Sequence, residues 1–141
     1  MGTNDTPATG NIMQIPGYTI MSELGRGGMA TVYLAIQECF GRKVALKVMS
    51  PALLTDPTFG ERFLREARIV ARLSHPHIVA VYEVGVHADH HFIAMEYHPG
   101  GDLQERITKG ITPEESVSIA QQIALALDHA HSKGYIHRDV K

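Results

Sequence analysis

A glycine-rich turn between two strand-like segments is the feature that most limits what this chain can fold into. Residues 18–24 form a strand-like run, residues 31–36 alternate as in a half-buried strand, and Gly25-Arg26-Gly27-Gly28 joins the two. A dinucleotide-binding loop leads into a helix instead, and a Walker loop requires Gly-Lys-Ser/Thr, which this turn lacks. The turn therefore favours a hairpin whose glycines let backbone N–H groups approach phosphates. An ordinary hairpin turn is the alternative that this motif alone leaves open.

The rest of the chain predicts a mixture of short strands and helices. A third strand at 43–49 follows a second short turn and completes an antiparallel meander. Asp56 and Pro57 form a helix start, because Asp caps the N-terminus and Pro suits the first helical position. Further along we expect a helix from 57 to about 75, followed by strands at 78–86 and 92–97. Asp102 then caps a short helix. A longer helix follows a capping box at Thr112 and ends near Gly134.

Composition narrows the function classes. Hydrophobic residues make up 44% of the 141 residues, which is enough for a packed core. Lys and Arg number 13 and Asp and Glu number 15, so no positive excess favours nucleic acid or an anionic membrane surface. The one cysteine cannot form an internal disulfide, and no apolar run reaches the length of a membrane span or resembles a secretory signal. We therefore expect a cytoplasmic domain at 17–141 behind a flexible tail at 1–16.

A histidine-rich segment lies in the turn between the last two expected strands. It contains His87, Asp89, His90 and His91. A polar turn is a simpler interpretation of these residues than a set of metal ligands, so we predict no metal site.

Lys47 is the most informative charged residue. It lies within an apolar strand and shares a face with Ala45, so its ammonium group points toward a sheet surface where an anion is favoured. Glu66, on the helix that begins at Pro57, is the expected partner, and such a pair holds a lysine where it meets two phosphates of ATP. A lysine that snorkels to water and a solvated glutamate are the alternative.

Six motifs occur in the order found in protein kinases. They are Gly25-x-Gly27-x-x-Ala30-x-Val32, Val44-Ala45-Leu46-Lys47, Arg65-Glu66-Ala67, Leu73-Ser74-His75-Pro76-His77-Ile78-Val79, Met95-Glu96-Tyr97 and His137-Arg138-Asp139-Val140-Lys141. Together they resemble the bacterial Ser/Thr kinases of the eukaryotic (Hanks) type, from about Gly17 to the last residue. The resemblance implies an α+β fold with a five-stranded antiparallel N-lobe sheet and helix C at about 17–97. A hinge at about 96–101 and the first C-lobe helices (D and E) at 102–141 would follow.

The resemblance also implies a nucleotide site. Its adenine and ribose contacts would be Leu24 and Val32 above the adenine, Ala45 beneath it, Met95 as gatekeeper, the backbone groups of Glu96 and His98, and Asp102 at the ribose. Backbone amides of the glycine-rich loop would shelter the phosphates. That loop comprises Gly25, Arg26, Gly27, Gly28, Met29, Ala30 and Thr31.

The catalytic groups and the substrate class follow from the same resemblance. Lys47 would contact the α- and β-phosphates and pair with Glu66. Asp139 would orient the substrate hydroxyl and accept its proton, and Lys141 would contact the γ-phosphate. A lysine at position 141 is typical of kinases that act on Ser and Thr rather than Tyr. The implied reaction is therefore transfer of the γ-phosphate of ATP to Ser/Thr hydroxyls of proteins.

The sequence departs from the family pattern in two places. The third glycine of the loop is Ala30, a small residue from which we expect little effect. The protein ligands for Mg²⁺ are expected beyond Lys141, so we expect the 141-residue chain alone to be catalytically incompetent. A truncated kinase-like module that binds nucleotide or a partner without catalysis is the alternative. The apolar stripe on the helix at 113–132 would be the surface for such a partner.

Overall fold

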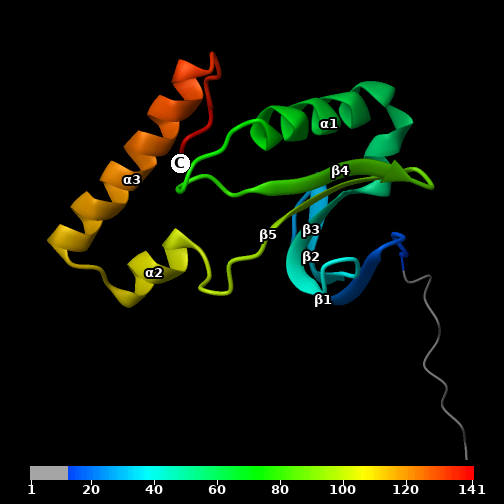
Figure 1. Cartoon of the computed structure of the whole chain (residues 1–141), viewed down its shortest axis with the longest axis horizontal. Helices are drawn as coiled ribbons and strands as arrows, with labels where there is room; N and C mark the ends of the chain where they lie inside the picture. Colours follow the sequence, from blue (N-terminus) through cyan, green and yellow to red (C-terminus); the bar gives the residue numbers. More distant parts are fainter. Residues whose placement is uncertain (1–12) are drawn as a thin grey trace, which may run out of the picture.

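The chain forms one antiparallel sheet followed by two helices (Figure 1). A computed structural model describes residues 13–141, without the side chain of Leu54. The elements are β1 (Tyr18–Arg26), β2 (Ala30–Gln37), β3 (Arg42–Met49), the 3-10 helix η1 (Pro51–Thr55), α1 (Pro57–Ala71), β4 (Val81–His87), β5 (His90–Glu96), α2 (Leu103–Lys109) and α3 (Pro113–Ser132). The five strands pair in the order β1-β2-β3-β5-β4. This arrangement confirms the expected α+β fold.

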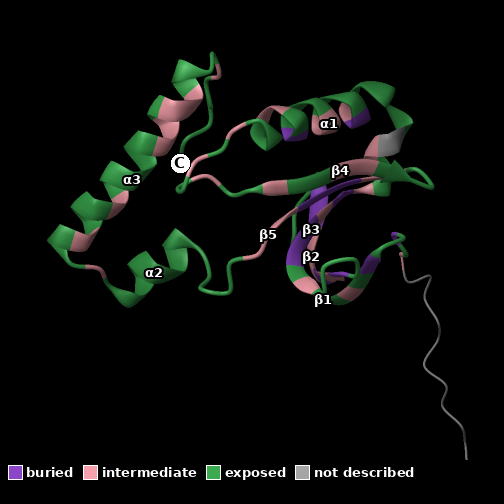
Figure 2. Cartoon of the chain, viewed as in Figure 1, coloured by how far each residue is buried: buried purple, intermediate pink, exposed green. Residues whose placement is uncertain are grey.

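The helices differ in how much of their surface the sheet covers. α1 packs against β4 and β5 and buries Gly60 and Ala67. Figure 2 shows that buried residues concentrate in the sheet, whereas α2 and α3 are largely exposed and contain no buried residue. Among the helices of residues 13–141, none is both long and apolar enough to cross a membrane.

The centre of the core comes from β3. Val44 and Leu46 are completely buried and Val48 is nearly so, because alternate residues of a strand point to the same face. Phe92 and Ala94 of the neighbouring strand β5 join them in the main hydrophobic cluster. Removing these side chains from water is the main favourable contribution to folding.

The sheet curls until its two edge strands meet. The hydroxyl of Tyr18 on β1 donates a hydrogen bond to Glu83 on β4, although β1 and β4 are the two ends of the sheet order. Gln37 donates to the same hydroxyl oxygen at 3.3 Å, and the Tyr18 ring meets Phe92 edge-on with centroids 5.8 Å apart. Burial, and then the Glu83 carboxylate, raises the pKa of Tyr18, so the hydroxyl keeps its proton at neutral pH.

The packed part of the chain begins earlier than the sequence predicted. Ile15 was placed in the flexible tail at 1–16, but it is only 2% exposed and belongs to the core. Its carbonyl accepts a hydrogen bond from the backbone N–H of Tyr18 at 3.1 Å, which turns the chain into β1. Residues 1–12 of the predicted tail lie outside the described residues.

Some elements differ from the sequence predictions. α1 ends at Ala71 rather than near His75, β4 begins at Val81 rather than at residue 78, and no sequence pattern had indicated η1. A turn explains the late start of β4, because the N–H of Ile78 bonds to the carbonyl of His75 at 3.1 Å instead of to a neighbouring strand.

The capping box predicted at Thr112 is confirmed. The Thr112 hydroxyl accepts from the backbone N–H of Glu115 at 3.1 Å, and the Glu115 carboxylate accepts from the backbone N–H of Thr112 at 2.9 Å. The pKa of Glu115 is lowered, mainly by the hydrogen bond from the Thr112 N–H and next by the hydrogen bond from the Arg106 side chain. Two backbone donors at the start of α3 are thereby satisfied.

Gly85 provides a test of the core packing. An added Cβ there would lie 2.8 Å from Cζ of the buried Phe92 ring, so we expect Gly85→Ala to destabilise the chain by about 1–3 kcal/mol. Gly100→Ala is the matched control, because its Cβ would meet no atom within 4 Å. Denaturant unfolding followed by circular dichroism measures both. Equal stability of the two variants would contradict this packing.

Candidate nucleotide site

One face of the sheet gathers the residues expected to surround a nucleotide. Val32 on β2 and Ile93 on β5 both lie opposite Lys47, and Met95 lies opposite Ala45. Opposed residues of antiparallel strands point to the same side, so these five side chains share the face that is turned away from the core. Ala45 is buried, and Lys47 and Met95 are half-buried. The structure thus brings together four of the predicted site residues.

The glycine-rich turn is a tight hairpin tip. Gly25 lies opposite Val32 and Arg26 opposite Thr31, and the N–H of Gly27 bonds to the Ala30 carbonyl at 2.9 Å. Gly28 and Met29 form the tip, and Met29 is 62% exposed. Leu24 falls at an irregularity of the β1–β2 register and is also exposed. The Met29 carbonyl accepts a hydrogen bond from the N–H of Ser50 at 2.9 Å, so the tip is held to the chain just after β3.

An exposed ion pair lies within β1 beside the tip of this hairpin. Nε and Nη2 of Arg26 donate to the two carboxylate oxygens of Glu23 at 3.1 and 2.8 Å. The Arg26 guanidinium lowers the pKa of Glu23. Arg26 lies opposite Thr31 and therefore on the other side of the hairpin from Val32. Its side chain thus braces β1 from behind, while only its backbone faces the expected phosphate position.

The expected pair between Lys47 and Glu66 is not formed. Among residues 13–141, the ion pairs with a nitrogen–oxygen distance up to 4.0 Å do not include these two residues. α1 buries Gly60 and Ala67, while Glu66 beside them is exposed. Lys47 therefore lies half-buried on an apolar face without a carboxylate partner in the described part of the chain.

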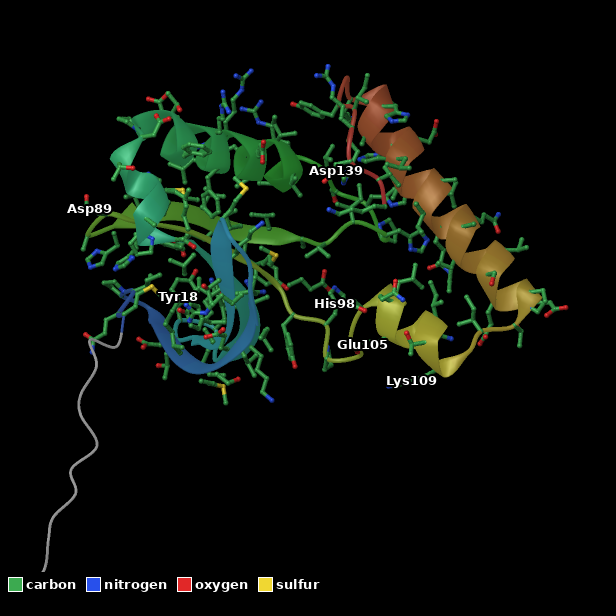
Figure 3. All side chains as sticks on the ribbon, turned by 180° about the vertical axis from the view of Figure 1, so that it is seen from behind. Tyr18, Asp89, His98, Glu105, Lys109 and Asp139 are labelled. Atoms are coloured by element: carbon green, nitrogen blue, oxygen red, sulfur yellow. The ribbon has the colours of Figure 1, made fainter. Side chains whose placement is uncertain are left out.

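The segment after β5 is held by side-chain contacts. The N–H of Glu96 donates to the Ala80 carbonyl at 2.9 Å, and its carboxylate accepts from the Ala80 N–H at 3.3 Å. His98, labelled in Figure 3 between β5 and α2, places Nε2 3.4 Å from the same carboxylate. Asp102 caps α2 by accepting from the N–H of Glu105 at 2.8 Å. The sequence predicted the cap but gave no signal for the contacts of Glu96.

The last residues place the expected catalytic groups next to each other. The ammonium group of Lys141 lies 3.6 Å from the Asp139 carboxylate, and both side chains are exposed. The N–H of Asp139 donates to Nδ1 of His137 at 3.1 Å. Arg138 between them has a positive φ of 65°, a conformation that turns the chain sharply. Figure 3 shows Asp139 on the segment that follows α3.

The histidine-rich turn between β4 and β5 does not gather ligands. Ala88 and Asp89 form its tip, and both have positive φ values. Figure 3 shows Asp89 at the far end of the sheet from Asp139. Within residues 13–141, no group of three or more His, Cys, Asp or Glu side chains is arranged to hold a metal ion.

A groove of about 540 Å³ lies on the opposite face of the sheet. Its floor includes Thr31 and Val48, which oppose each other in the β2–β3 register one residue away from Val32 and Lys47. Neighbouring strand residues point to opposite faces, so this groove is separate from the Lys47 face.

Comparisons with known proteins identify the family. The family model described as protein kinase domain matches residues 18–141. The chain belongs to the protein kinase family. Within it, the predicted resemblance to bacterial Hanks-type Ser/Thr kinases is confirmed, and the chain is an N-terminal portion of such a kinase domain.

Named relatives show how much of a kinase the chain covers. It is 41% identical to the serine/threonine-protein kinase PrkC of Bacillus subtilis over 88% of this chain and 19% of that protein. It is 43% identical to the serine/threonine-protein kinase PknJ of Mycobacterium tuberculosis over 89% of this chain and 21% of that protein. The solved PknI kinase domain of M. tuberculosis superposes with a TM-score of 0.76 at 39% identity, covering 92% of this chain and 54% of that chain. The chain thus spans about a fifth of these curated relatives.

The exposed position of Glu66 yields a stability prediction. Because Glu66 has no ion pair with Lys47 in the structure, we expect Glu66→Gln to change the free energy of unfolding by no more than about 0.5 kcal/mol without nucleotide. Glu61→Gln, another exposed glutamate of α1, is the control. Thermal unfolding measures both. A selective loss of about 2 kcal/mol in Glu66→Gln would show that the pair exists in solution.

Proposed function

We propose that this kinase domain portion binds ATP on the face formed by Val32, Ala45, Lys47 and Met95. The observation that carries the proposal is Lys47, which is half-buried among apolar neighbours with no carboxylate within 4.0 Å in the described residues. A lysine that lies on an apolar face without a carboxylate partner is available to pair with an anionic ligand. The α- and β-phosphates of ATP supply such an anion, and the glycine-rich tip offers backbone N–H groups to the same phosphates.

The adenine end of the site is assigned to the backbone after β5. Met95 lies on the Lys47 face, so the backbone groups of Glu96 and His98 follow at the edge of that face. Ala45, which the family resemblance places beneath the adenine ring, is small and buried. We propose Asp102, the N-cap of α2, as the contact to the ribose hydroxyls.

The proposed reaction of the complete domain is phosphoryl transfer to protein Ser and Thr. The hydroxyl oxygen of the substrate forms a bond to the γ-phosphorus, the bond to the β–γ bridging oxygen breaks, and ADP leaves. Asp139 accepts the hydroxyl proton. The ammonium group of Lys141, 3.6 Å from the Asp139 carboxylate, neutralises charge on the γ-phosphate. A substrate peptide approaches freely because both side chains are exposed.

No residue in the described part of the chain is assigned as a protein ligand for Mg²⁺. Kinases of this family use Mg²⁺ to neutralise the phosphates, but within residues 13–141 no cluster of three or more ligating side chains exists. We therefore propose that these 141 residues alone bind ATP without transferring its γ-phosphate.

A second candidate function is a partner-binding module. The exposed apolar side chains of the C-terminal part favour it, since α3 has no buried residue. The most exposed of them are Val117 at 69%, Ile136 at 68% and Val140 at 62%. Ile119 and Leu127 of the predicted stripe are half-buried rather than fully uncovered.

Lys47→Met tests the proposed function. We expect it to weaken ATP binding by roughly 10- to 100-fold, because one charge-assisted contact to phosphate contributes about 1.5–3 kcal/mol. Adenosine, which has no phosphate, should bind both proteins equally. Titration calorimetry of the 141-residue chain measures the affinities.

Lys43→Met is the matched control, since Lys43 is an exposed lysine of the same strand. If Lys47→Met binds ATP as tightly as the unsubstituted chain does, the proposed site is contradicted. Phosphate transfer by the unsubstituted chain to a Ser/Thr substrate, lost in Lys47→Met, would contradict the proposed lack of catalysis.

A further inference from the structure

The side chain of Glu96 is directed away from the nucleotide face. In the β3–β5 register Met95 lies opposite Ala45, whereas Glu96 lies opposite Val44, which points into the core. Successive strand residues point to opposite faces, so the Glu96 carboxylate leaves the sheet on the side away from Lys47. It therefore has no direct route to a nucleotide, and any effect on binding must act through the backbone.

That carboxylate contacts one backbone donor and one side chain. Oε2 of Glu96 accepts from the Ala80 N–H at 3.3 Å, while the Glu96 N–H donates to the Ala80 carbonyl at 2.9 Å. The two hydrogen bonds close a ring between the end of β5 and the residue before β4. Nε2 of His98 lies 3.4 Å from the same oxygen. We call Ala80, Glu96 and His98 the hinge brace.

The brace connects to the second half of the chain. Ala80 ends the segment at 72–80, and His75 in that segment stacks on His129 of α3 with ring centroids 5.2 Å apart. The backbone at 96–98 is thus held from two sides: by its own strand β5, and by a segment that also touches α3. Two-sided support restricts the rotations that would move the backbone donors and acceptors at 96–98.

We propose that Glu96 is a positioning residue for the adenine ring, whose carboxylate holds the backbone of residues 96–98 in the geometry that accepts adenine. The inference rests on the proposed ATP site and deepens it. Binding groups held in place before the ligand arrives lose less conformational freedom on binding, which raises affinity and sharpens selectivity. The brace therefore favours ATP over GTP, since guanine presents the opposite donor and acceptor pattern at its six-membered ring.

Glu96→Ala removes the brace while leaving the backbone groups in the chain. We expect ATP and adenosine to bind about 5- to 10-fold more weakly, as for loss of a preorganising hydrogen bond. Inorganic tripolyphosphate, which has no base, should bind with unchanged affinity. The preference for ATP over GTP should fall by a similar factor. Calorimetry on the 141-residue chain measures all four ligands.

Two further variants separate positioning from a loss of folding. Glu96→Gln keeps an acceptor oxygen at the same distance and should retain most of the affinity for adenosine. Glu96→Asp keeps the charge but is one methylene too short to reach the Ala80 N–H, so it should bind adenosine as weakly as Glu96→Ala. Circular dichroism verifies that each variant is folded. If Glu96→Ala does not fold, the contrast between Gln and Asp decides.

Glu38→Ala is the control for loss of a carboxylate hydrogen bond elsewhere. Glu38 accepts from the Thr19 hydroxyl at 3.0 Å, on the turn between β2 and β3, and its loss should leave all four affinities unchanged. An unsubstituted chain that fails to bind ATP would overturn the proposed function and this inference together. If the unsubstituted chain binds ATP and Glu96→Ala binds it equally well, the inference alone is overturned. The same holds if Glu96→Ala weakens the binding of tripolyphosphate as much as that of ATP.

Discussion

β3 is paired along both edges, with β2 and with β5, and its side chains alternate between the core and the opposite face. Burial of Val44, Leu46 and Val48 fixes this alternation, because a slip of one residue would move Lys47 into the core and Leu46 to the surface. Burying an unpaired ammonium group costs far more than the pairing could recover. The hydrophobic core therefore decides where the lysine points, and the site on the other face of the sheet follows from it.

The same register orders the hinge. Because β5 pairs with β3, the alternation that turns Met95 toward the Lys47 face turns Glu96 the other way, toward Ala80. At the end of β5, the backbone therefore borders the nucleotide face, while the Glu96 carboxylate bonds to the segment before β4. The contact of His75 with His129 then links that segment to α3. Packing on one face of the sheet in this way supports binding on the other.

Local signals in the sequence were sufficient for the strands, the α-helices and the order of the motifs, but not for η1 or for every element boundary. The capping box at Thr112 and the hairpin around Gly27 depend on residues close in sequence, and the structure confirms both. Contacts between distant residues left no local signal. The Tyr18–Glu83 bond joins residues 65 apart and the Ala80–Glu96 bond joins residues 16 apart, so neither periodicity nor spacing indicated them. The Lys47–Glu66 pair was expected from the strand and helix positions of the two residues and from the family resemblance, but this chain leaves Glu66 exposed.

Hydrogen–deuterium exchange of the chain with and without ATP tests most directly whether the Lys47 face is the nucleotide site. Each face also has segments that do not line the other, so one experiment distinguishes them. On this account ATP slows exchange at the amides of the glycine-rich tip, residues 27–29, and of the hinge, residues 96–98. The amides of Ala52 and His90, which line the groove on the opposite face, should exchange at an unchanged rate. Protection confined to Ala52 and His90, or no protection at a saturating ATP concentration, would contradict the account.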